Sequence, residues 1–520
     1  MPRPGHGWRP VSRGARPPVC WCRSWVPEPF RAGDGCGTWS WWRQKWSRPN
    51  PRLYETVGTM RAMFVQDSDS HAATTGWRRL WQALPKAALG NLVAKLLMVS
   101  LGLAITVMVA RQGPRVQGAF ALFVAVEAGL LTLFSGLGLW LARQMSQQAD
   151  ARSARTLPML RGVLRAAVGL GAVASLGLLA LSWGAKSLPY SQLWLLALAA
   201  PFLLLVPTAT GLWLGEGRMW PINLAQVAAP ALVLGGLAGV AWIGEGTTRS
   251  TSMVVLVLTA WVSGKSLVAV ITAIYALRNA SQRDEDLAEH LRLSDLPPLG
   301  DTHPVWWHQW PFVATIGVTN VISLLNYRAS LFLVEHFQGL STVGTYSVAV
   351  TVAELLWLLS SSVTVSLYAR IGHPDVKVAA SMTVQAVRIN VLATMAAAPV
   401  LLGLAWWGLP WVMGEVYAAS LWPLAALLPG VAAYAAASSL SAFYTNHLGR
   451  PQLSGGIAGL SLLVSFGLGW LLVPRWGAVG AAVSSSLGYI VAIAVAYGVF
   501  LRHAGLPVRA LWQPSLTRVP

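Results

Sequence analysis

Two glutamates stand inside apolar stretches that are long enough to cross a membrane. Glu127 is the one charged residue of GAFALFVAVEAGLLTLF, and Glu354 has a similar place in STVGTYSVAVTVAELLW. A charge in hydrocarbon is costly and is retained where it pairs, binds an ion or faces a water-filled path. Both acids are therefore predicted to carry a proton or a sodium ion, or to balance a positive charge. The structural alternative is an ion pair that fixes each helical hairpin.

Positively charged side chains also lie inside apolar stretches. Lys95, Lys265 and Arg328 stand well away from the nearest loops. Asn91 precedes Lys95 by one turn on the same helix face. In a dry helix bundle such cations need a compensating anion or a water-filled cavity. We therefore predict that these four residues line a cavity for an anionic substrate, with snorkelling or internal ion pairs as the alternative roles of the two lysines.

The elements that must position these groups are membrane-spanning helices. The chain is 55% hydrophobic and 11% charged, whereas soluble domains are about a quarter charged. A helix of about 20 apolar residues crosses a bilayer, and the chain holds twelve such runs. The predicted spans cover residues 86–110, 117–142, 160–183, 192–215, 220–243, 251–277, 309–334, 343–368, 381–407, 422–445, 452–473 and 478–501. Kinks or breaks are predicted at the prolines inside them, Pro201, Pro207, Pro230, Pro399 and Pro429.

The distribution of Lys and Arg among the loops predicts the orientation. The even-numbered loops, with the adjoining helix ends and the C-terminus, hold fifteen, whereas the odd-numbered loops hold five. Cytoplasmic loops are the ones enriched in positive charge, so both termini are expected in the cytoplasm. Arg161 and Arg388 lie near the cytoplasmic ends of the third and ninth spans. They are expected either to anchor those ends or to help capture an anion.

The first 62 residues have a different composition. They are rich in Arg, Pro, Gly and Trp and carry eleven Lys or Arg against three acids. We expect residues 1–85 to form a basic, disordered extension. A true start at Met63 would make residues 1–62 non-native, and one at Met60 would make residues 1–59 non-native. All three cysteines lie here without the partners or spacing of a zinc site, so no metal is expected. The remaining positive charge sits mainly in short loops, so no nucleic-acid partner is expected.

The chain contains an internal repeat with a shift of about 227 residues. The matching residues are Gly118 and Gly344, Glu127 and Glu354, Arg143 and Arg370, and Arg161 and Arg388. Two halves of six spans each share one orientation, which makes the repeat parallel and places the substrate path between the halves. The expected domains are a six-helix bundle over residues 86–277, a cytoplasmic connector over 278–308, a second six-helix bundle over 309–501 and a cytoplasmic tail over 502–520.

These segments resemble the polysaccharide flippases of the multidrug/oligosaccharidyl-lipid/polysaccharide exporter superfamily. Their first hairpin is similar to VARQGPRVQGAFALFVAVEAGLLTLFSGLGLWLARQ, their eighth span to STVGTYSVAVTVAELLW, and their closing spans to LVPRWGAVGAAVSSSLGYIVA. The resemblance covers residues 86 to 503, approximately. It implies an all-α polytopic membrane protein with about twelve transmembrane helices, in two parallel six-helix repeats that form a V-shaped, MATE-like transporter. Ala329 is a departure, because many relatives carry an Asp near this position, so any ion coupling must use another residue.

The resemblance also implies a function. It implies transport of a polyprenyl-diphosphate-linked oligosaccharide from the cytoplasmic to the outer leaflet of the bacterial inner membrane, for polysaccharide biosynthesis. The cationic lining would then hold the diphosphate, and coupling to H+ or Na+ would require no other cofactor. Implied partners are the lipid-linked oligosaccharide, membrane lipids, a polysaccharide polymerase and a chain-length regulator. Serines of the eighth span, Ser360, Ser361, Ser362 and Ser366, are expected to face the glycan or to pack helices.

Two other functions are compatible with a membrane bundle. A drug antiporter of the same superfamily would favour an acidic or aromatic cavity, because its substrates are cations. A membrane glycan polymerase or glycosyltransferase would usually need a sizeable outer loop with catalytic residues. The predicted outer loops are short and nearly bare of acids. No catalytic residue is therefore assigned, and the chain is not expected to be an enzyme.

Overall fold

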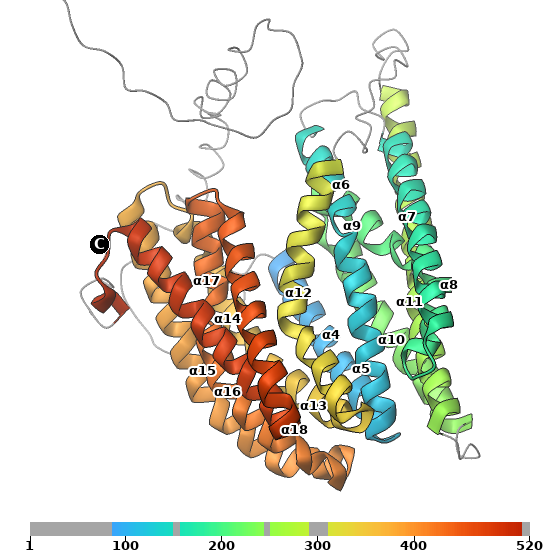
Figure 1. Ribbon diagram of the computed structural model, residues 1–520. Helices are drawn as coiled ribbons and strands as arrows, with labels where there is room; N and C mark the ends of the chain where they lie inside the picture. The colour runs from blue at the N-terminus through green and yellow to red at the C-terminus, as the bar shows by residue number, and fades with distance from the viewer. Residues whose placement is uncertain (1–85, 149–155, 244–249, 291–309, 512–520) are drawn as a thin grey trace, which may run out of the picture. The chain divides into compact units, whose positions relative to one another are not determined.

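The computed structural model describes residues 86–148, 156–243, 250–290 and 310–511, and these residues are helical apart from short turns (Figure 1). Eleven helical segments among them are long and apolar enough to cross a membrane. One segment, α18 (Pro451–Ala504), has 54 residues, which is about 80 Å of helix for a hydrocarbon core of about 30 Å. It therefore has to cross more than once, and the chain is a multi-pass, all-helical membrane protein.

Gly477 divides α18 into two spans. Its backbone has φ 57° and ψ −133°, outside the helical region. A Cβ built on Gly480 would lie 2.3 Å from the carbonyl oxygen of Leu472, and one on Gly488 would lie 2.0 Å from Oγ of Ser465. The contact nearer to Gly477 on one arm is also the nearer one on the other arm, and likewise for the farther contact, so the two arms run antiparallel. Counting both arms gives the twelve spans predicted from the sequence.

The N-terminal half of the repeat supplies the first six spans. Its elements are α4 (Lys86–Ala110), α5 (Pro114–Leu133), α6 (Gly136–Gln148), α7 (Thr156–Gly184), η1 (Tyr190–Gln192), α8 (Leu193–Leu203), α9 (Leu205–Gly215), α10 (Met219–Ile243) and α11 (Ser250–His290). The second span is divided between α5 and α6, and the fourth between α8 and α9. Pro201 lies just before the second of these breaks, as predicted, whereas α10 continues through Pro230.

The C-terminal half repeats this pattern of breaks. Its elements are α12 (Trp310–Gln338), α13 (Leu340–Glu354), α14 (Trp357–Ile371), α15 (Val376–Met413), η4 (Glu415–Ser420), α16 (Leu421–Tyr434), α17 (Ala437–Ala442), η5 (Phe443–His447), α18 and η6 (Val508–Leu511). The eighth and tenth spans are the divided ones, which are the repeat mates of the second and fourth. Pro429 precedes the break between α16 and α17, whereas α15 continues through Pro399.

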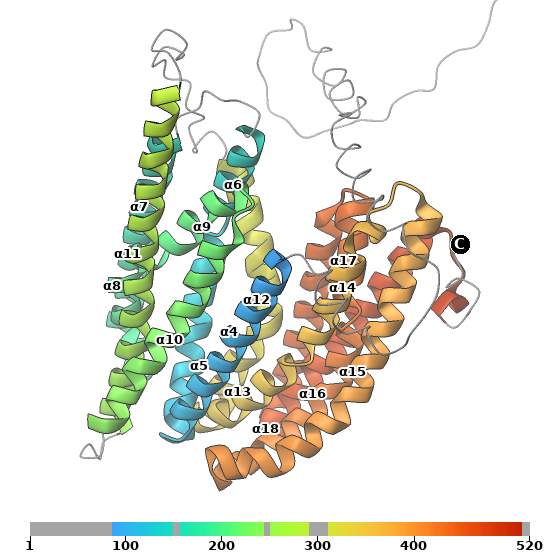
Figure 2. The same ribbon diagram turned by 180° about the vertical axis from the view of Figure 1, so that it is seen from behind.

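The two halves touch most closely where α5 crosses α13, and glycines make this crossing possible. A Cβ built on Gly118 would lie 2.0 Å from the carbonyl oxygen of Leu340, and one on Gly344 would lie 1.9 Å from that of Pro114. The two contacts exchange matching positions of the repeat, so the crossing is symmetric. The glycines of the repeated sequence motif therefore serve close helix packing. Figure 2 shows α5 and α13 from the side opposite to Figure 1.

A second crossing joins α12 to the break between α5 and α6. A Cβ on Gly317 would lie 2.1 Å from the carbonyl oxygen of Leu133, and one on Gly136 would lie 2.5 Å from that of Val313. Asn320 Nδ2 donates to Ser135 Oγ over 3.1 Å beside them. In both views α12, coloured yellow, lies against α5 of the other half (Figures 1 and 2). Span seven thus contacts both halves.

The sixth span is longer than expected. Its predicted end was near residue 277, but α11 continues to His290, so the first part of the expected connector is helical. Hydrogen bonds account for the extension: Ser281 Oγ donates to Glu285 Oε1 over 3.0 Å, and Asp284 accepts from the first backbone amides of α7. The rest of the expected connector, the N-terminal extension and residues 512–520 of the C-terminal tail lie outside the described residues.

Candidate functional site

A cavity of about 460 Å³ is lined by both halves of the repeat. Helices α4, α5, α10 and α11 line it from the N-terminal half, and α12 and α13 from the C-terminal half. Two charged residues are among the lining residues, Lys265 of α11 and Arg328 of α12, and both are cations. The structure thus brings two of the four residues predicted to line a cavity, Lys265 and Arg328, to one cavity. Most of the remaining wall is apolar, with amides and hydroxyls from Gln117, Gln226, Thr106, Ser347 and Thr351.

Lys265 is held by the glutamate of the second span. Its Nζ donates to Glu127 Oε1, and Trp261 Nε1 donates to the other carboxylate oxygen. The ammonium also lies 4.5 Å from the centroid of the Trp261 ring, an attractive arrangement because the ring face is electron-rich. The Glu127 side chain is 2% exposed and that of Lys265 is 24% exposed. The carboxylate of this pair is therefore buried, whereas the lysine side chain remains partly accessible.

Arg328 is held by the repeat-related glutamate. Its Nη1 lies 3.0 Å from Glu354 Oε1, and its Nη2 donates to Oε2 over 3.1 Å. This two-pronged geometry fixes both side chains more firmly than a single contact would. Both remain partly accessible, at 30% and 24%. The rings of Tyr327 and Trp357 pack beside the pair, with centroids 5.0 Å apart.

The acids of the two ion pairs occupy matching positions of the repeat, whereas the cations do not. Glu127 and Glu354 occupy matching positions of spans two and eight, whereas Lys265 comes from span six and Arg328 from span seven. Neither glutamate is among the residues that line the cavity. The positive groups thus form the charged part of this wall, and their glutamate partners lie outside the lining. An anion that entered would compete with the glutamates for the same donors.

Lys95 and Asn91 lie outside this lining. Lys95 is exposed on α4 and Asn91 is partly buried. The α4 residues that do line the cavity begin with Met98 and Gly102. The spacing of three and seven residues places Lys95 on the same helix face, one turn closer to the start of α4. It pairs with neither glutamate in the ion pairs described above, and its predicted role stays a prediction.

Arg161 and Arg388 are also absent from the lining residues. Arg161 is exposed near the start of α7, and Arg388 is partly buried in α15, where it has interactions of its own. Their proposed part in capturing an anion stays a prediction. Among the serines of span eight, Ser360 and Ser361 line a second, smaller cavity, whereas Ser362 and Ser366 do not.

Sequence reasoning missed Trp261. This residue supplies the second donor to Glu127 and the ring beneath Lys265. A usable signal was present, because Trp261 and Lys265 are four residues apart and therefore share a helix face. The spacing gives no indication of which acid they face, since Glu127 is more than a hundred residues away in the chain.

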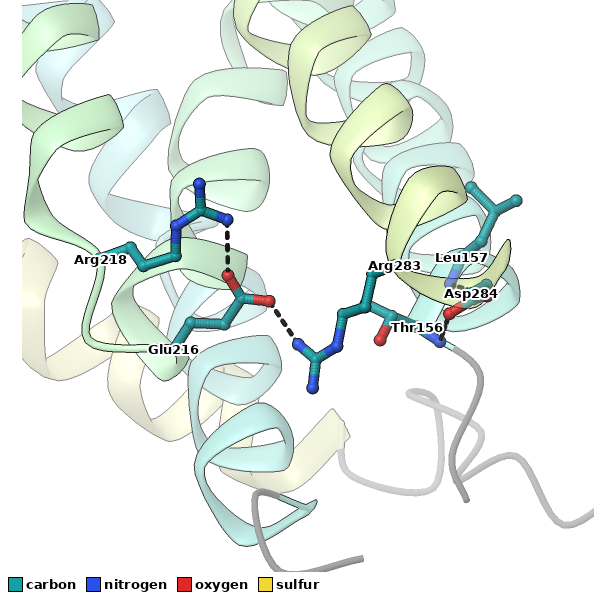
Figure 3. A network of polar contacts seen from close by, with 6 residues as sticks. All are labelled: Thr156, Leu157, Glu216, Arg218, Arg283 and Asp284. Atoms are coloured by element: carbon teal, nitrogen blue, oxygen red, sulfur yellow. Dashed lines mark hydrogen bonds and ion pairs between the residues drawn. The ribbon is translucent and has the colours of Figure 1, made fainter. Parts of the chain in front are cut away.

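A further polar network lies at the even-loop ends of the N-terminal helices (Figure 3). Glu216, after α9, pairs with Arg218 over 3.4 Å and also with Arg283 on the extension of α11. Asp284 accepts from the backbone amides of Thr156 and Leu157 over 2.8 and 3.0 Å. These contacts tie the starts and ends of α7, α9 and α11 together. Both arginines are about half exposed, so the network has the features of a surface anchor.

Solved transporter structures share this fold. One is an inward-facing multidrug resistance MATE-family transporter of the MOP superfamily, with TM-score 0.63 and 17% identity, covering 83% of this chain and 100% of that one. Another is the lipid II flippase MurJ in an inward closed conformation, with TM-score 0.62 and 14% identity, covering 82% and 89%. A third is a MOP-superfamily transporter from Pyrococcus furiosus described by the reverse polarity of its binding pocket, with TM-score 0.53, 16% identity and coverage of 82% and 95%.

No protein-family model and no curated protein matches the chain. At these identities the structural likeness establishes the fold, which is the one that transporters of the MOP superfamily adopt. The fold expected from the sequence, twelve helices in a MATE-like arrangement, is thereby confirmed.

Proposed function

We propose that the chain is a flippase that moves a polyprenyl-diphosphate-linked oligosaccharide from the cytoplasmic to the outer leaflet of a bacterial inner membrane. The observation that carries the proposal is that Lys265 of the N-terminal half and Arg328 of the C-terminal half line the same cavity. A diphosphate cannot enter a low-dielectric cavity unless fixed cations replace its hydration. Cations contributed by both halves also allow the two halves to respond together when the anion binds or leaves.

The glutamates give the empty carrier a way to reset. With no anion present, Glu127 and Glu354 neutralise the two cations, so that the unloaded cavity carries no uncompensated charge. When the diphosphate arrives it takes over donors from the carboxylates, and a proton or sodium ion then compensates the displaced acids. In this mechanism ion coupling and substrate binding use the same two pairs, without the Asp that Ala329 replaces.

The alternative function is a small-molecule antiporter of the same superfamily, since such transporters and a lipid flippase share this fold. Its cationic drugs would need acidic or aromatic groups in the cavity wall. The charged lining residues here are cations, and neither glutamate is among the lining residues. The arrangement therefore favours an anionic substrate.

The proposal is tested by a neutral replacement that leaves no lone charge behind. Arg328→Gln combined with Glu354→Gln removes the cation and its partner together, so the protein should be produced at a normal level. Export of the glycan from cells that depend on this chain should fall at least about tenfold, the factor for about 1.4 kcal/mol. Arg328→Lys should keep part of the activity because the charge remains and the planar fork is lost. Normal export by the double variant would refute the proposal.

A further inference from the structure

The second cavity lies within the C-terminal half and has a volume of about 330 Å³. Helices α12, α14, α16, α17, η5 and α18 line it. Six serines, three tyrosines and one tryptophan are among its lining residues, and the rest are apolar. No acid, lysine or arginine is among them. The cavity is therefore neutral and rich in hydroxyl groups, in contrast to the cationic cavity beside it.

The polar groups of this wall keep capacity for a ligand. A hydroxyl can donate one hydrogen bond and accept two, and the serine pair Ser441 and Ser454 uses one bond of 2.9 Å between its hydroxyls. The buried Trp357 Nε1 has no hydrogen-bond partner among the described residues. The indole nitrogens of Trp140 and Trp213, which line neither cavity, are unpaired as well, so the argument for a ligand rests on the hydroxyl groups.

Flat aromatic surfaces accompany these hydroxyls. The rings of Tyr327 and Trp357 lie with centroids 5.0 Å apart, and Tyr434 packs 5.9 Å from Tyr327. Rings of this kind offer an apolar face together with a polar edge. A sugar ring has the complementary surface, with C–H groups on its faces and hydroxyls around its edge. The serine hydroxyls of this wall already have partners within the chain. Their oxygens can still accept further hydrogen bonds, which the hydroxyls of a sugar can donate and an acyl chain cannot.

Helix α12 contributes to the walls of both the neutral and the cationic cavity. Ser323 and Tyr327 line the neutral cavity, and their immediate neighbours Leu324 and Arg328 line the cationic cavity. Consecutive residues of a helix point about 100° apart, so the two cavities lie on adjoining faces of one helix. A ligand with an anionic part next to a neutral, hydroxyl-rich part would match both.

We propose that the neutral cavity binds a sugar ring of the same substrate whose diphosphate is held by Lys265 and Arg328. This proposal rests on the proposed function and adds a second subsite to it. The volume corresponds to about ten water molecules at roughly 30 Å³ each, which is enough for a single sugar ring. The subsite would select substrates that carry a neutral sugar near the diphosphate and would bind bare lipid carriers less tightly.

The experiment uses two neighbouring serines of α14. Ser361 and Ser362 are both exposed, and both hydroxyls donate to the carbonyl oxygen of Leu358, but only Ser361 lines the cavity. Ser361→Phe should fill the subsite, and Ser362→Phe is the matched control. The full chain is purified in detergent, and its affinity is measured for a short polyprenyl diphosphate and for the same lipid carrying one neutral hexose.

The wild type and Ser362→Phe should bind the hexose lipid about tenfold more tightly than the bare lipid, as expected for one or two additional hydrogen bonds. Ser361→Phe should bind both lipids with the affinity of the bare one. Equal binding of the two lipids by the wild type, or an undiminished hexose effect in Ser361→Phe, would overturn the sugar subsite alone. A wild type that binds neither lipid would overturn the proposed function as well.

Discussion

Replacing Lys265 by methionine should destabilise the protein more than replacing Arg328 by methionine. In the first variant Glu127, whose side chain is 2% exposed, would keep only its hydrogen bond from Trp261. Removing one partner of a buried ion pair costs about 3–5 kcal/mol, because the remaining charge is neither paired nor hydrated. In the second variant the abandoned Glu354 is 24% exposed, so water can solvate it and the expected cost is about 1–3 kcal/mol.

A second substitution separates this cause from simple loss of packing. Glu127→Gln removes the negative charge while its amide oxygen can still accept from Trp261. The double variant Lys265→Met, Glu127→Gln should therefore recover about 2 kcal/mol relative to Lys265→Met alone, a coupling within the range for contacting residues. Unfolding free energies are measured in mixed detergent micelles by circular dichroism. Equal costs for the two methionine variants, or no recovery in the double variant, would refute the burial argument.

Two further predictions concern helix packing and topology. Gly118→Ala should cost about 1–3 kcal/mol of unfolding free energy, because its methyl group would meet the Leu340 carbonyl and force α5 away from α13. Gly129→Ala in the same helix has no heavy atom within 4 Å of its Cβ position and should be neutral or slightly stabilising. Equal losses at both glycines would contradict the close crossing. A reporter that is active only outside the cytoplasm should be active after Ser187 and silent after Thr302, because positive charge is concentrated in the even-numbered loops; the opposite result would invert the orientation.

The architecture was largely predictable because a membrane leaves few options. Every backbone group must be paired within the hydrocarbon, so long apolar runs become helices whose ends the sequence reveals. The first span was predicted at residues 86–110, and α4 has these bounds. The extension of α11 to His290 was not predicted, because it depends on Asp284 meeting the start of α7 from another part of the chain. The hydropathy pattern of a sequence does not reveal polar contacts between distant segments.

The candidate site was only partly predictable for the same reason. Glu354 was predicted to carry an ion or to balance a positive charge, and it pairs with Arg328 of the adjacent span. The sequence did not indicate which cation Glu127 meets; it pairs with Lys265, because α5 packs against α11 in the bundle. For the neutral cavity, the sequence indicated only the serines of span eight. Its tyrosines come from α12, α16 and η5, and only the fold brings them together.

The central claim is that the cavity moves an anionic lipid, and a reconstituted assay tests it most directly. The purified chain is placed in vesicles with a fluorescent polyprenyl diphosphate that carries a short neutral glycan, and its transfer between leaflets is followed by quenching from outside. The wild type should equilibrate the lipid across the bilayer, whereas the Arg328→Gln, Glu354→Gln double variant should slow transfer at least about tenfold. A wild type that leaves the lipid in place but exchanges a cationic drug for protons or sodium would contradict the account.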